Sequence, residues 1–176
     1  MLRPVLIAAL LSSCAREQPA PVVPPPPPAP TPASAVLEQM DARKPVPLLP
    51  MMANHQKQNM RDHLLAVQEI VAALATEDFA AIEKAAGRIG FSEQMGQMCT
   101  HMGAGAPGFT EQALAFHHTA DGIAVAARAK DKAKVLSELT ATLQTCTACH
   151  ATWKQQVVDE QAWQKVTASA PPTMKH

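Results

Sequence analysis

Residues 131–157 read DKAKVLSELTATLQTCTACHATWKQQV, and this stretch decides the fold. Apolar positions recur in it at alternating steps of three and four, which places them on one face of a helix. Asp131 stands just before the repeat, where a helix N-cap is expected. The repeat therefore predicts a long helix whose buried stripe includes part of a cysteine motif. Its members are Leu136, Leu139, Leu143, Cys146, His150, Trp153 and Val157.

Three other segments have the same helical period. The first begins at Met51, the second runs from Thr76 as N-cap to about Arg88, and the third from Thr110 to about Lys130. A shorter helical piece is expected over residues 92–102. Four amphipathic segments with short connections predict an all-α chain folded as an antiparallel four-helix bundle. In the first segment the predicted buried stripe is Met60, Leu64, Val67, Val71 and Leu74.

Composition sets the limits of this domain. The 176 residues include 15 Lys+Arg and 15 Asp+Glu, and this balance argues against a nucleic-acid partner. Aromatic residues make up only 3%, which disfavours an all-β fold. Of the 16 prolines, twelve lie from Pro19 to Pro50. The chain is therefore expected to divide into an N-terminal extension, a domain over residues 51–168 and a C-terminal tail over residues 169–176.

The first residues have the parts of an export signal: one Arg, a short apolar run and small residues. We expect residues 1–13 to be a signal peptide. The sequence Leu11-Ser12-Ser13-Cys14 resembles a bacterial lipobox, which implies cleavage before Cys14 and its lipidation. Ordinary signal cleavage nearby, leaving Cys14 as a thiol, is the alternative. Residues 14–50 would then tether the domain through an extended Pro-rich segment to the periplasmic side of a bacterial membrane.

Within the last predicted helix, Cys146-Thr147-Ala148-Cys149-His150 is a C-x-x-C-H sequence, the attachment signature of c-type haem. Two thiols at this spacing can add to the two vinyl groups of one haem, and the adjacent His150 can bind the iron. A thioredoxin-like redox pair, half of a zinc site and a structural disulfide are alternatives. The first would need a βαβ pattern and the second a matching cysteine pair, and the sequence has neither.

Around this motif the chain resembles the class II cytochromes c, which comprise the cytochromes c′ and their low-spin relatives. The resemblance covers roughly residues 51–165 and rests on the motif near the end of a four-helix bundle, followed by Trp153 and Lys154. Lys154 departs from the family, which commonly has Arg there. The resemblance implies one haem c per chain, and it is compatible with a homodimer.

The resemblance also implies that the residue facing the open side of the iron comes from the first helix, as a Met in low-spin members. Met60 matches that place, and a Met opposite His150 would suit electron transfer. Met60 packed in the core, with a five-coordinate iron that binds small gases, is the alternative. Met51, Met52 and His63 are rival ligands.

A second group of soft side chains lies between the second and third helices: Met95, Met98, Cys99, His101 and Met102. These residue types suit Cu(I), although Met-rich packing is the preferred interpretation. Of the adjacent His117 and His118, at most one is expected to face the core, because neighbouring helical residues point about 100° apart.

These observations predict a membrane-tethered electron carrier that binds redox partner proteins transiently. A gas-binding protein of the cytochrome c′ type is the alternative, and a copper-handling protein is a weaker third hypothesis. No enzymatic activity is expected, because the sequence has no evident nucleophile–base pair or catalytic carboxylate pair.

Overall fold

The computed structural model describes residues 33–168, and most of them are helical, which confirms the expected helical class. The predicted signal peptide, Cys14, most of the Pro-rich segment and residues 169–176 lie outside the described residues. None of the described helices is both long and apolar enough to cross a membrane. In chain order the elements are α1 (Ala33–Met40), β1 (Lys44–Leu48), α2 (Pro50–Ala75), α3 (Phe79–Ile89), α4 (Glu93–Gly103), α5 (Phe109–Arg128), α6 (Lys132–Thr152), β2 (Trp153–Val157) and α7 (Glu160–Ala168).

Side-chain caps explain where several helices begin. The Asp131 carboxylate accepts a hydrogen bond from the backbone N–H of Lys134 at 2.9 Å, so the predicted cap of α6 is confirmed. Ser92 caps α4 in the same way, accepting from the N–H of Met95. The cap of α3 is Asp78 rather than the predicted Thr76, which ends α2 instead. Each cap satisfies an N–H group that would otherwise have no helical partner.

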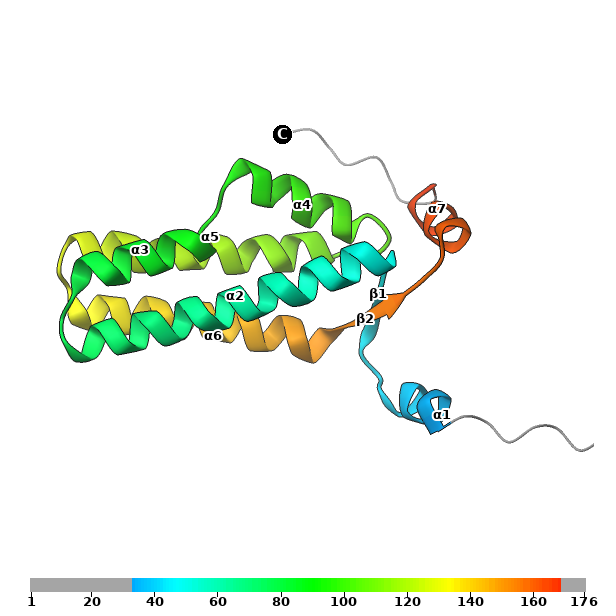
Figure 1. Cartoon of the computed structure of the whole chain (residues 1–176), viewed down its shortest axis with the longest axis horizontal. Helices are drawn as coiled ribbons and strands as arrows, with labels where there is room; N and C mark the ends of the chain where they lie inside the picture. The colour runs from blue at the N-terminus through cyan, green and yellow to red at the C-terminus, as the bar shows by residue number, and fades with distance from the viewer. Residues whose placement is uncertain (1–32, 169–176) are drawn as a thin grey trace, which may run out of the picture. The chain divides into compact units, whose positions relative to one another are not determined.

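Four of the helices pack in sequence: α2 against α3, α3 against α5, and α5 against α6 (Figure 1). Their buried side chains form one core, to which α2 contributes Ile70, α3 Ile82, α5 Ile123 and α6 Leu139. The pair α2 and α6 is different, because these helices border the same core yet do not pack extensively on each other. One side of the arrangement is therefore much less tightly closed than the other three.

The predicted stripe of α2 is wrong for three of its five members. Met60 is 38% exposed, Leu64 71% and Val71 54%. Small side chains allow helices to approach closely, so the buried face follows alanines as well as larger residues. The large apolar side chains beside that face remain at its edge. The buried core residues of this half of α2 are Ala66, Ile70, Ala73 and Leu74.

The repeat on α6 shows the same offset. Leu139 is buried as predicted, whereas Leu136 is 48% exposed and Leu143 40%. His150 is exposed as well, contrary to its predicted place on the buried stripe. Val135 and Thr142 are buried instead, because the true core face is rotated by one position toward α5. The last two members of the predicted repeat, Trp153 and Val157, lie beyond the helix.

A short parallel sheet replaces the end of the predicted last helix. At Trp153 the backbone becomes extended, with φ −120° and ψ 145°, and Lys44 to Leu48 of β1 pair with Trp153 to Val157 of β2. β1 tolerates Pro45 and Pro47 because it is an edge strand, whose alternate N–H groups need no partner. Val46 and Leu48 of β1 are fully buried in a second core, to which Trp153 also belongs.

Because β1 belongs to it, the folded unit begins earlier in the chain than predicted. The chain divides into a unit that ends at Met40, of which α1 is the described part, and a unit that begins at Asp41. No residue of α1 is buried. The second unit thus begins ahead of the boundary at Met51 that the proline distribution predicts. Two prolines of the supposed tether are strand residues.

Candidate functional site

Cys146 and Cys149 lie on the last two turns of α6, and neither forms a disulfide. Both thiols are partly buried. Cys146 packs against the core shared by α2, α3, α5 and α6, whereas Cys149 packs against the second core. The motif therefore bridges the two apolar clusters of the folded unit.

Burial raises the pKa of both thiols, that of Cys149 to about 11, with a further contribution from Cys146 nearby. Cysteines that exchange disulfides have a lowered pKa, because their reaction requires the thiolate. The shift of this pair goes in the opposite direction. The surroundings of the pair therefore disfavour a thioredoxin-like redox function.

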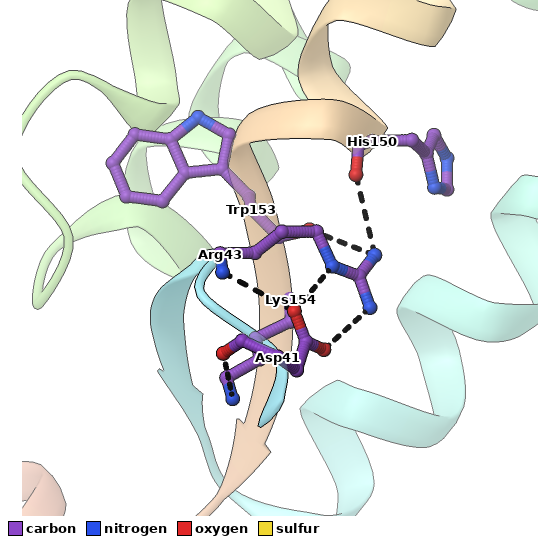
Figure 2. A network of polar contacts seen from close by, with 5 residues as sticks. All are labelled: Asp41, Arg43, His150, Trp153 and Lys154. Atoms are coloured by element: carbon purple, nitrogen blue, oxygen red, sulfur yellow. Dashed lines mark hydrogen bonds and ion pairs between the residues drawn. The ribbon is translucent and has the colours of Figure 1, made fainter. Parts of the chain in front are cut away.

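His150 occupies the last turn of α6, and a polar network holds its backbone (Figure 2). Arg43 donates from Nη1 to the His150 carbonyl at 3.2 Å and to the Trp153 carbonyl at 3.4 Å. A guanidinium group at this place also complements the negative end of the helix dipole. The imidazole of His150 points away from the network, so the main chain is fixed while the ring stays exposed (Figure 2).

The network continues through Asp41 and Lys154. Arg43 donates from Nε and Nη2 to the two carboxylate oxygens of Asp41, at 2.9 and 2.8 Å. This pairing lowers the pKa of Asp41 to about 2. Lys154, where the resembled family commonly has Arg, donates to the carbonyl of Asp41 at 2.9 Å. The residues just before β1 thus brace the segment that follows the cysteine motif, a contact that sequence reasoning missed.

An apolar seam lies along the weakly packed pair of helices. We define it as Met60, Leu64 and Val71 of α2 with Leu136 and Leu143 of α6, all at least 38% exposed. On α2 these residues are on the flank opposite Glu69, which binds Arg88 of α3. On α6 they are on the flank opposite Thr145, whose hydroxyl contacts that of Thr119 on α5. Both flanks therefore border the side where α2 and α6 fail to pack.

Met60 is at one end of this seam, and His150 follows Leu143 on the same flank of α6. α2 and α6 are antiparallel (Figure 1), and Gln155, just after α6, donates to the Gln56 side chain of α2 at 2.5 Å. Met60 is one turn beyond Gln56 on α2, and His150 is on the last turn of α6. His150 is on the same flank of α6 as Leu143, because seven residues make nearly two turns. Met60 and His150 thus lie toward adjoining ends of the two antiparallel helices.

The rival ligand His63 faces the interior. Its ring stacks on Phe116 of α5 with centroids 4.8 Å apart, and it meets His117 edge-on at 5.3 Å. Burial, with a smaller contribution from His117, lowers the pKa of His63 to about 4. His117 is buried and its Nδ1 is 2.8 Å from the Ile89 carbonyl, whereas His118 is exposed. The expectation that only one of this His pair faces the core is confirmed.

The soft side chains of α4 point to different partners. Cys99 is buried, and its pKa is raised to about 11 by burial and by Cys149. The ring of exposed His101 meets Trp163 of α7 edge-on at 5.9 Å. The Met98 sulfur is instead 3.0 Å from Nε2 of His55 on α2. Sequence reasoning missed His55, because its partner Met98 is 43 positions away and no local pattern links the two.

Comparison with family models, with curated proteins and with solved structures gives no match to this chain. The residues themselves are compatible with a covalently bound haem. Both thiols of the motif are free, the imidazole of His150 is exposed, and apolar side chains border the adjoining seam.

Proposed function

We propose that this chain is a c-type haem protein of the class II kind, an antiparallel four-helix bundle of α2, α3, α5 and α6 that carries electrons. Cys146 and Cys149 would hold one haem through thioether bonds, and His150 would bind its iron. The observation that carries the proposal is the placement of this motif. Two free thiols and an exposed imidazole occupy the end of α6 beside a seam that α2 and α6 leave unpacked.

When bound, haem supplies a one-electron iron couple. The side chains of this protein would set its surroundings. Leu64 and Leu143, exposed on the two flanks of the seam, would cover apolar surface and exclude water from it. Arg43 would keep the last turn of α6 in place through the carbonyl of His150, and so orient the ligand.

We further propose that Met60 is the sixth ligand. It is on the seam flank of α2, at the end of the seam where the last turn of α6 carries His150. A thioether opposite an imidazole favours a low-spin iron of raised potential, which suits an electron carrier. If Met60 stays away from the iron, the five-coordinate alternative follows, and the protein would bind nitric oxide or another small gas.

The remaining parts of the proposal concern residues outside the structure. An export signal at residues 1–13, lipidated Cys14 and the Pro-rich segment would hold the haem domain at the periplasmic side of a bacterial membrane. There it would meet redox partner proteins transiently, through a small contact surface near the haem edge.

Optical and magnetic spectra of the haem-loaded protein test the axial ligation. The wild type should be low-spin in both oxidation states and should show the sulfur-to-iron charge-transfer band when oxidised. Met60→Ala should lose this band and become high-spin, because no thioether replaces it. Met51→Ala, a change at an 80% exposed Met of the same helix, should keep the wild-type spectrum. A high-spin wild type, or a Met60→Ala spectrum identical to the wild type, would refute Met60 ligation and favour the gas-binding function.

A further inference from the structure

A histidine and a methionine from different helices converge at the N-terminal end of α2. Nε2 of His55 is 3.0 Å from the sulfur of Met98 on α4. The side-chain amide of Asn59, one turn after His55, is 3.3 Å from the same sulfur and 3.4 Å from the same nitrogen. Two atoms that can each donate an electron pair to a metal therefore lie within one small volume.

The surroundings of this contact are rich in thioethers. Met98 is partly buried against the second core, and so is Met52, which precedes His55 by three residues on the same side of α2. Met102 of α4, one turn after Met98, is buried in that core. The contact thus combines an exposed imidazole with the sulfur of Met98, and two further Met residues are in the adjoining second core.

Apolar packing does not account for this contact. α4 packs mainly on α5 and more lightly on β1, and it has no extensive contact with α2. His55 is exposed, so burying apolar surface does not require its ring to point at Met98. Within residues 33–168 no three His, Cys, Asp or Glu side chains group together as a metal site. A metal ion bound here would therefore have to be one that accepts thioether sulfur as a ligand.

The other soft residues of α4 do not share this position. The Cys99 thiol is buried, at 3% exposure, whereas the imidazole of His55 is at the surface. His101 lies against Trp163 of α7. The candidate ligands are thus reduced to one imidazole and neighbouring thioethers.

From this convergence we propose a site for a soft monovalent cation, Cu(I), bound by Nε2 of His55 and the sulfur of Met98, with Met52 as a further thioether donor. Imidazole and thioether ligands suit Cu(I), whereas Mg²⁺ and Ca²⁺ prefer oxygen ligands. Its ligands differ from Cys146, Cys149, His150 and Met60, although Met52, Met98 and Cys149 all pack against the second core.

Competition between the haem-loaded, full-length protein and a chromophoric Cu(I) chelator, without oxygen, tests this site. The wild type should bind one equivalent of Cu(I) that Met98→Leu and His55→Asn each weaken by about tenfold or more, because each removes a ligand. Met51→Leu and Cys99→Ser should bind as the wild type does. Circular dichroism should show all variants folded, and their haem spectra should be unchanged.

Two results would overturn the proposal. One is a wild type that competes no better than a chain with both His55→Asn and Met98→Leu. The other is binding that Cys99→Ser abolishes while Met98→Leu leaves it intact. If the chain carries no haem, the same titration in a Cys146→Ser/Cys149→Ser background excludes the motif's thiols. The copper result therefore stands apart from the haem proposal.

Discussion

At the scale of single residues, the local sequence reveals the structural position of some side chains and not of others. Asp131 is at the N-cap because a carboxylate that accepts N–H bonds stabilises a helix start wherever the helix packs. The exposure of Met60 and Leu64 could not be predicted in the same way. Both are at the edge of a face whose centre is set by neighbouring helices. The contact of His55 with Met98 joins residues 43 positions apart, so no local pattern indicates it.

His63 makes the stability of the haem-free protein depend on pH. Its pKa of about 4 is below the ordinary value of 6.5, so between these values the unfolded chain binds more protons than the folded one. The free energy of unfolding contributed by this group is therefore fully present above about pH 6.5, falls toward pH 4 and then levels off. In urea titrations across this range, His63→Phe should show a shallower loss than the wild type.

His118→Gln is the matched control, because it also removes one histidine, but an exposed one outside the core that holds His63 and His117. Its pH dependence should follow the wild type. Parallel curves for the wild type and His63→Phe would show that the protonation of His63 does not differ between the folded and unfolded chains.

At the scale of elements, the sequence predicted the helical extent of α6 up to the motif and failed just after it. The period of three and four continues to Val157, but the chain leaves the helix at Trp153. The reason is tertiary. Trp153 fills the second core and meets Phe109 edge-on, while the residues after it pair with β1, more than 100 positions earlier. A strand whose pairing partner lies so far away in the chain has no signature in a local stretch of sequence.

The N-cap of α6 should contribute measurably to stability. Asp131→Ala removes the acceptor for the N–H of Lys134 and should lower the free energy of unfolding by about 1 kcal/mol. Asp131→Asn, which keeps an acceptor oxygen at the same position, should retain most of the stability. Chemical denaturation monitored by circular dichroism measures both. Equal destabilisation by the two changes would mean that the charge of Asp131, rather than its hydrogen bond, matters.

For the whole molecule, the helical class follows from composition and periodicity, whereas the extent of the folded unit does not. Pro45 and Pro47 suggest a tether, yet in β1 they alternate with the buried Val46 and Leu48. Proline is compatible with both an extended linker and an edge strand. Only the presence of β2 and of the second core distinguishes the two.

Two truncations test this boundary. A chain that begins at Asp41 should unfold with the same free energy as the full chain, because no residue of α1 is buried. A chain that begins at Pro50 loses Val46 and Leu48 from the second core and should be less stable by several kcal/mol, at roughly 1.5–3 kcal/mol for each side chain. Equal stability of the two truncated chains would place β1 outside the folded unit.

The central claim is the covalent haem at the end of α6, and the intact mass of the protein, made in cells with c-type haem maturation, tests it most directly. The wild type and Cys99→Ser should each carry the mass of one haem that acid and organic solvent do not extract. Cys146→Ala/Cys149→Ala should have the mass of the bare chain, because both attachment thiols are gone. A wild type with the mass of the bare chain, or with haem that the solvent removes, would contradict the account.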